Sequence, residues 1–120
     1  MEKTDILTSK TGARSDIIVV HVLGYLDTVA AYNFREQLDE LIKSGNHKYI
    51  IDLEKLDYIS SAGIGVFPAI APDLQKKKGG IVFVNVSEKT LKLFKMIGLT
   101  TIFKVKDTLE NAVKEFDADG

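Results

Sequence analysis

Apolar and polar residues follow two patterns along this chain, and their alternation predicts a fold that alternates strands and helices. Several short runs are nearly continuous in apolar, often β-branched residues, as in the run at residues 17–23. Such runs are typical of strands that are covered on both faces of a sheet. A weaker run near the N-terminus predicts an edge strand, followed by a turn at residues 12–15. The expected strands are residues 5–9, 17–23, 49–53, 81–86 and 99–105.

The segments between these runs carry apolar residues at helical spacing, with charged residues among them. We expect Asp27, Ser87 and Asp107 to be the N-caps of three helices, because their side chains can accept hydrogen bonds from the first free N–H groups. The first helix has as its apolar positions Val29, Phe34, Leu38, Leu41 and Ile42. The expected helices are residues 28–43, 61–77, 88–96 and 108–116.

Two prolines, Pro68 and Pro72, fall inside the second expected helix. A proline in a helix interior removes a backbone hydrogen bond and costs about 3 kcal/mol. We therefore expect this helix to be kinked, or to be broken near Phe67.

The order of the elements indicates the fold class. Strands and helices alternate after an initial pair of strands, which is typical of a layered α/β structure. We expect a mixed, mostly parallel sheet of four to five strands with about four helices packed on it. The chain has 120 residues, the length of one ordinary domain, so residues 1–120 are expected to form a single domain.

Composition narrows the classes of function. Sixteen basic and seventeen acidic side chains leave a net charge of −1, which argues against a nucleic-acid partner. The absence of cysteine excludes disulfides and thiolate metal sites. The N-terminus lacks the apolar core of a signal peptide, and no apolar run approaches the roughly 20 residues of a membrane-spanning helix. We expect a soluble, cytoplasmic protein without a membrane partner.

The most informative feature is the pair Ser60–Ser61, which follows a polar connector at the start of the second helix. One serine suffices to cap a helix, and here there are two. Gly63 and Gly65 follow in the first turns, where each costs about 1 kcal/mol relative to alanine. They indicate either tight packing of the helix on its sheet or the close approach of a partner or a nucleotide phosphate.

A hydroxyl at this position lies beside the free N–H groups and the positive end of the helix dipole. That environment accommodates a phosphate, so a phosphorylatable serine that acts as a switch is our first hypothesis. Asp27 and Asp57 are expected nearby, because the ends of parallel strands gather at one edge of a sheet. A carboxylate there would oppose a phosphate.

Three enzyme or phosphorelay interpretations are less well supported. A serine hydrolase needs glycine two residues before its nucleophile, and Ile59 stands there relative to Ser61. His21 lies in a strand and His47 in a distant turn, with no clustered partners for a metal, so neither a metal nor a cofactor is expected. Asp52 ends a central strand, like the acceptor of a phosphorelay receiver domain, but the acidic pair that holds magnesium in that family is missing.

Three segments carry a resemblance to a known family: Gly24–Asp27, Leu53–Val66 and Leu93–Leu99. On the basis of these three segments, the chain resembles a STAS domain of the anti-sigma factor antagonist (anti-anti-sigma) type, and the resemblance covers essentially its whole length. The resemblance implies the STAS fold and a protein without catalytic activity. It implies that the unphosphorylated form binds an anti-sigma factor that is also a serine kinase, and so releases a sigma factor. The kinase phosphorylates the antagonist, and a PP2C-type phosphatase resets it.

Family members usually read Asp-Ser-Ser/Thr-Gly, and the serine directly after the aspartate is modified. In this chain Ser60 takes the place of the aspartate, Ser61 that of the modified serine and Ala62 that of the next hydroxyl. The resemblance therefore implies phosphorylation at Ser61, with Ser60 as the alternative acceptor. The implied partner-binding residues are Asp27, Ser60, Ser61, Ala62, Gly63, Ile64 and Gly65.

A second interpretation uses the same surface differently. The chain would then be a STAS scaffold or binding module of another complex, in stress sensing or lipid transport, without a kinase cycle. In either case we expect a monomer or a weak dimer.

Overall fold

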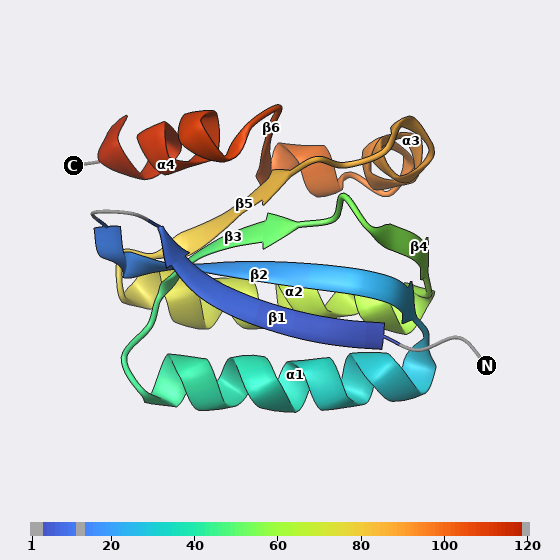
Figure 1. Cartoon of the computed structure of the whole chain (residues 1–120), viewed down its shortest axis with the longest axis horizontal. Helices are drawn as coiled ribbons and strands as arrows, with labels where there is room; N and C mark the ends of the chain where they lie inside the picture. The colour runs from blue at the N-terminus through green and yellow to red at the C-terminus, as the bar shows by residue number, and fades with distance from the viewer. Residues whose placement is uncertain (1–3, 12–13, 119–120) are drawn as a thin grey trace.

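A central sheet with helices packed on both of its faces forms the molecule (Figure 1). The computed structural model describes residues 4–11 and 14–118. In chain order the elements are β1 (Thr4–Thr11), β2 (Arg14–Leu26), α1 (Thr28–Lys43), β3 (Lys48–Asp52), β4 (Leu56–Ile59), α2 (Ser61–Lys76), β5 (Gly80–Val84), α3 (Glu88–Met96), the 3-10 helix η1 (Leu99–Thr101), β6 (Lys104–Lys106) and α4 (Leu109–Ala118).

The sheet confirms the predicted fold class. Its order is β1-β2-β3-β5-β6, with β4 paired to β2 outside this path. Only β1 runs antiparallel to its neighbour among these pairs, and the others are parallel, so the sheet is mixed and mostly parallel. The described residues contain four α-helices, as expected, and six strands, one more than the upper limit predicted. The expected turn at residues 12–15 includes residues 12–13, which lie outside the described residues.

The additional strand is β4, which lies in the segment that sequence analysis took for a polar connector. β3 and β4 both pair in parallel with β2, with Asp52 opposite His21 and Ile59 opposite Leu26. They are two parts of one interrupted strand. Asp57 and Tyr58 are exposed, so β4 lacks the apolar run that announces a covered strand, and its pairing with β2 decides its conformation instead.

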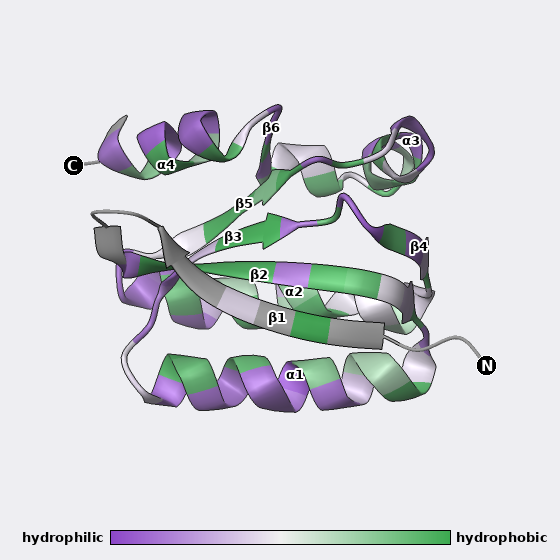
Figure 2. Cartoon of the chain, viewed as in Figure 1, coloured by the Kyte–Doolittle hydropathy of each residue, from purple (hydrophilic) through white to green (hydrophobic). Residues whose placement is uncertain are grey.

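The core has two parts because successive strand residues point to opposite faces of the sheet. Val20 and Ile51 belong to the larger part, under α1 and α2, whereas Val19 and Ile50 pack with Phe116 of α4. Figure 2 shows the apolar sides of α1 and α4 turned toward the sheet and their hydrophilic sides turned away. A chain of edge-to-face ring contacts runs through the larger part and consists of Phe34, Phe67, Phe83, Phe94 and Phe103.

Helix α2 is continuous from Ser61 to Lys76 with both prolines inside it, so the predicted break near Phe67 is wrong. Each proline costs about 3 kcal/mol because it has no N–H to donate. Burial of one large apolar side chain contributes about 1.5–3 kcal/mol. The helix buries five such side chains, which together offset the two prolines: Ile64, Val66, Phe67, Ile70 and Leu74.

The C-terminal part departs from prediction at two points. The expected strand at residues 99–105 begins as η1, and only Lys104–Lys106 form a strand. Leu99 and Phe103 are both buried, and a turn in which the Phe103 N–H donates to the Leu99 carbonyl at 2.9 Å points both inward. The predicted cap Asp107 is also wrong, because the Thr108 hydroxyl accepts the hydrogen bond from the Asn111 N–H, at 3.1 Å.

The other two predicted caps are confirmed. The Asp27 carboxylate accepts from the Ala30 N–H at 2.9 Å, at the start of α1. The Ser87 hydroxyl accepts from the Thr90 N–H at 3.1 Å, at the start of α3. Both caps satisfy donors that would otherwise have no partner within the helix.

The Asp52 carboxylate, at the end of β3, contacts three neighbouring groups. One oxygen of its carboxylate lies 2.7 Å from His21 Nδ1 on β2, and the other accepts from the Glu54 N–H and the Asn85 side-chain amide, both at 3.0 Å. Partial burial by itself would raise the Asp52 pKa, but the hydrogen bonds from Asn85, Glu54 and His21 outweigh it and hold the pKa below its usual value. The ionised form is therefore stabilised by folding.

We predict that Asp52 contributes stability that depends on pH. Its pKa is lower in the folded than in the unfolded chain, so this contribution is present above the ordinary pKa of 3.8 and is lost as the pH falls through the folded value. Asp52→Asn should lower the free energy of unfolding by about 1–3 kcal/mol at pH 7, measured by urea denaturation. The deficit should shrink below about pH 4.

Asp73→Asn serves as the control, because Asp73 is an exposed carboxylate on α2 and should change stability by less than about 0.5 kcal/mol. A deficit for Asp52→Asn that stays constant from pH 7 to pH 3 would contradict the role of the charge.

Candidate functional site

The two serines lie where β4 passes into α2, beside the end of β2. Ile59 pairs with Leu26, and the Ser60 N–H donates to the Leu26 carbonyl at 2.9 Å. Asp27 follows Leu26 directly and caps α1. The parallel pairing of β2 and β4 therefore brings Asp27, Ser60 and Ser61 to one edge of the sheet, where α1 and α2 both begin.

Ser60 is the cap of α2 and is only 8% exposed. Its hydroxyl accepts from the Gly63 N–H at 3.0 Å and donates to the Leu26 carbonyl at 3.1 Å. The hydroxyl therefore uses both its donor and its acceptor in hydrogen bonds within the fold. Removing the oxygen would leave the Gly63 N–H at the start of α2 without its partner.

Ser61 is the first residue of α2 and is exposed. Within the part of the chain that the structure describes, its hydroxyl has no hydrogen-bond partner. It lies at the positive end of the helix dipole, where a negative group is favoured by about 0.3–1 kcal/mol. The two adjacent hydroxyls thus differ fully in environment, one inside the fold and one at its surface.

The two glycines also differ. A Cβ added to Gly63 would lie 2.9 Å from the Leu26 carbonyl oxygen, so this glycine is needed for close packing of α2 on the end of β2. A Cβ on Gly65 would meet nothing within 4 Å. Packing within the chain therefore explains Gly63 and does not explain Gly65.

The residues that the resemblance implied for partner binding fall into two groups. The exposed ones are Asp27, Ser61, Ala62 and Gly65. The buried ones, which lie beneath this surface, are Ser60, Gly63 and Ile64. Asp57 is exposed on β4 and adds a second carboxylate to this edge of the sheet.

Several apolar side chains are exposed near this edge, and their exposure was not predicted. Val29 and Tyr32 on the first turns of α1 are each 72% exposed, and Tyr58 on β4 is exposed beside Tyr25, with ring centroids 5.9 Å apart. Val29 was predicted on the apolar face of the first helix. Its distance of five residues from Phe34 corresponds to about 140° around the helix, and this spacing was the signal that it lies off the buried stripe.

The structure gives little support to a phosphorelay acceptor at Asp52 or to a metal site. Both oxygens of Asp52 are engaged by neighbouring groups, and His21 contacts this carboxylate. Among residues 4–11 and 14–118, no group of three His, Cys, Asp or Glu side chains is arranged to hold a metal ion. None of the helices described is both long and apolar enough to cross a membrane.

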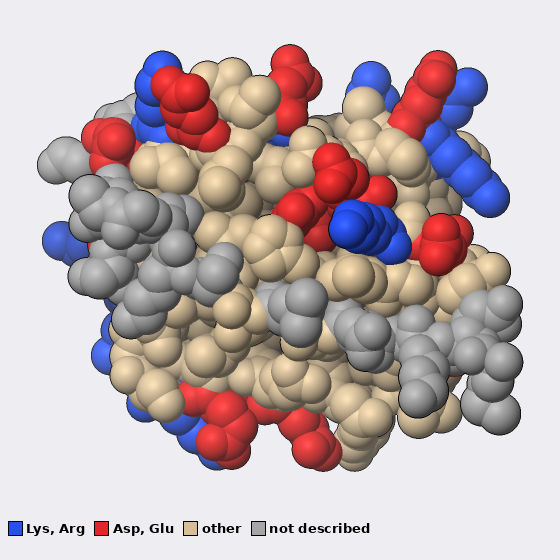
Figure 3. All heavy atoms as spheres, in the orientation of Figure 1, with Lys and Arg blue, Asp and Glu red and all other residues tan. Residues whose placement is uncertain are grey.

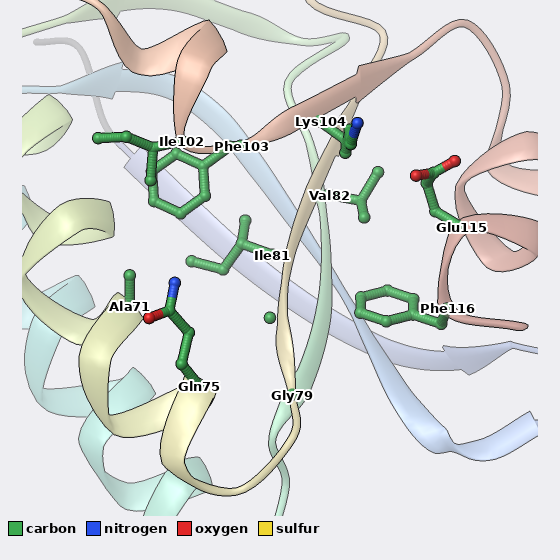
Figure 4. A pocket seen from close by; sticks show the side chains of 11 residues that line it. Ala71, Gln75, Gly79, Ile81, Val82, Ile102, Phe103, Lys104, Glu115 and Phe116 are labelled. Atoms are coloured by element: carbon green, nitrogen blue, oxygen red, sulfur yellow. The ribbon is translucent and has the colours of Figure 1, made fainter. Parts of the chain in front are cut away.

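A small cavity of about 200 Å³ lies away from the serines, at the other end of α2 (Figure 4). Ala71 and Gln75 of α2 border it on one side, and Lys104 of β6 and Phe116 of α4 lie across the β5 strand from them. Gln75 is fourteen residues from Ser61 along one helix, or about 20 Å. This cavity is therefore separate from the candidate site.

Comparison with known proteins identifies the family of this chain. The family model for the STAS domain matches residues 10–112. The anti-sigma-B factor antagonist of Bacillus subtilis is 31% identical over 97 residues, which cover 81% of this chain and 88% of that protein. That of Listeria monocytogenes is 28% identical over 93 residues, covering 78% and 82%.

Solved structures match over nearly the whole length. An anti-sigma factor antagonist from Mycobacterium paratuberculosis superimposes with a TM-score of 0.80 at 20% identity, covering 96% of this chain and 95% of that one. The Bacillus cell fate determinant SpoIIAA in its phosphorylated form gives a TM-score of 0.71 at 22% identity, covering 92% and 98%. From the match of the family model and the shared fold, we conclude that this chain belongs to the STAS domain family.

Proposed function

We propose that this chain is an anti-sigma factor antagonist of a partner-switching pathway. In its unphosphorylated form it binds an anti-sigma factor that is also a serine kinase, and so releases a sigma factor in the cytoplasm. The observation that carries the proposal is the exposed Ser61 at the start of α2, next to a buried neighbour that already serves as the cap. The names of the relatives, which are anti-sigma-B factor antagonists, support the same function.

The site distinguishes the two serines as phosphate acceptors. A kinase must reach the hydroxyl, and Ser61 is exposed whereas Ser60 is buried. A phosphate on Ser60 would break its hydrogen bonds to Gly63 and Leu26 and force the first turn of α2 away from β2. We therefore assign phosphorylation to Ser61 and the structural cap to Ser60.

Phosphorylation acts here through charge at a contact surface. It adds about 1.5–2 negative charges at pH 7. The favourable interaction of this charge with the helix dipole is worth only about 0.3–1 kcal/mol. Asp27 and Asp57, both exposed at the same edge, add negative charge and oppose the phosphate further. A partner that covers Ser61 without a matching cation would bury an unpaired charge at a cost of several kcal/mol. That cost lowers affinity a hundredfold or more without any change of fold.

The unmodified surface suits a protein partner. Ser61, Ala62 and Gly65 present small side chains on α2, so the backbone of a partner can approach closely. Val29 and Tyr32 on α1 supply large apolar side chains that a partner can bury. In this pathway the chain is the substrate of the kinase and of a PP2C-type phosphatase and has no catalytic activity of its own.

We predict a single phosphate on Ser61, mapped by intact-mass and tandem mass spectrometry of the protein from its native cells. Ser61→Ala should lose the phosphate and change the free energy of unfolding by less than about 0.5 kcal/mol. The matched variant Ser60→Ala should keep the phosphate and lose about 1 kcal/mol of stability through the cap. Phosphate on Ser60 would contradict the assignment, and no phosphate under any growth condition would favour a STAS scaffold without a kinase cycle.

We predict that Gly65→Ala separates stability from binding. Alanine at this exposed position of the helix should raise the free energy of unfolding by about 0.5–1 kcal/mol, because it restricts the backbone conformations of the unfolded chain. The added methyl group should lower the affinity for the kinase that modifies Ser61 at least tenfold, measured by titration calorimetry. Gly63→Ala is the matched control and should instead destabilise the fold, because its Cβ meets the Leu26 carbonyl. Unchanged affinity of Gly65→Ala would place the partner elsewhere.

A further inference from the structure

The outward side of α3 carries apolar and cationic side chains together. Met96 is 83% exposed, the largest exposure of any large apolar residue in the described part of the chain, and the next residue, Ile97, is 50% exposed. Lys92 lies four residues before Met96 and Lys89 three before Lys92, so all three share one side of the helix. We call Lys89, Lys92, Lys95, Met96 and Ile97 the α3 surface.

The packing of α3 explains why this side is free. Phe94 is buried and its ring contacts Phe83 of β5, at 5.2 Å between centroids. This contact turns the opposite side of the helix, with Lys92 and Met96, toward solvent. The packing of the fold therefore does not use the Met96 side chain.

Charge is segregated toward this part of the molecule. Helix α3 (Glu88–Met96) contains three lysines and one glutamate, a net charge of +2, whereas the rest of the chain has thirteen basic and sixteen acidic residues, a net charge of −3. None of the three lysines of the α3 surface forms an ion pair within residues 4–11 and 14–118. Figure 3 shows basic side chains projecting where Figure 1 places α3, with acidic atoms among them, and acidic side chains beside basic ones along the edge formed by α1.

We propose that the α3 surface docks on an anionic phospholipid bilayer. Its cations are all lysines, and aromatic residues are absent from it. Protein interfaces favour arginine, aromatic residues and methionine and are depleted in lysine, so the lysines, and not Met96, distinguish a lipid surface from a protein partner here. Lysine next to an apolar side chain is instead typical of surfaces that lie on lipid headgroups. Met96 and Ile97 enter the interfacial region while Lys92 and Lys95 contact lipid phosphates.

The charge distribution also sets the orientation. A negatively charged bilayer attracts the α3 side and repels the acidic remainder of the molecule. In Figure 1, α3 and α1 lie at opposite edges of the molecule, so docking through α3 leaves Val29 and Tyr32 uncovered. The expectation of no membrane partner rested on the absence of an apolar run long enough to span a bilayer. Contact through α3 is peripheral and sensitive to salt.

The test is co-sedimentation of the full chain with vesicles of phosphatidylglycerol and phosphatidylcholine, and with vesicles of phosphatidylcholine alone. We expect binding to the anionic vesicles only, falling as sodium chloride rises from 50 to 500 mM, since the Debye length shortens over this range. The double variant Lys92→Glu with Lys95→Glu should lower the partition coefficient at least tenfold. Met96→Ser should lower it severalfold.

The matched control is Lys76→Glu with Lys77→Glu, which changes the net charge equally at the far end of α2 and should leave binding nearly unchanged. Tyr32→Ser removes a large apolar side chain that is 72% exposed, from α1, and should also keep vesicle binding. Circular dichroism and thermal unfolding verify that each variant is folded. Absence of binding to anionic vesicles, or an equal loss in the control, overturns the proposal and leaves the α3 surface to an acidic protein.

Discussion

The contact between the end of β2 and the start of α2 is the interaction on which the candidate site depends. One carbonyl, that of Leu26, accepts from both the N–H and the hydroxyl of Ser60, at 2.9 and 3.1 Å. The backbone of Gly63 packs against the same carbonyl so closely that a Cβ would lie 2.9 Å from it. Because Asp27 caps α1 one residue later, this single junction determines where both helices begin.

The interruption between β3 and β4 makes this junction possible. Between the His21–Asp52 and Leu26–Ile59 pairs, β2 advances five residues and the opposite segment advances seven. The extra residues leave the ladder, and the Asp52 carboxylate accepts the Glu54 N–H that the ladder no longer pairs. The Glu54 N–H thereby has a hydrogen-bond partner at the point of the break. The chain can then rejoin β2 in the register that places Ser60 against Leu26.

Adjacent residues in these helices differ in whether they pack on the sheet or face solvent. Successive helix residues are rotated by about 100°, so Ser60 and Gly63 face the sheet while Ser61 and Gly65 face solvent. The same holds in α3, where Phe94 enters the core and Met96 points outward. Short segments can therefore be constrained by packing on one side and remain free to evolve binding properties on the other.

The sequence by itself determined the elements whose signals are local. The apolar runs of β2, β3 and β5, the helical spacing in α1 and the caps Asp27 and Ser87 were all readable, because hydrophobic periodicity and capping act within a few residues. The double serine was recognisable as a candidate site for the same reason. Tertiary structure alone decided what depends on partners far along the chain. It made β4 a strand through pairing with β2, kept α2 unbroken through burial of its apolar side, and turned Leu99–Thr101 into a helical turn. It also chose which serine is buried, because the Leu26 carbonyl that binds Ser60 lies 34 residues earlier in the sequence.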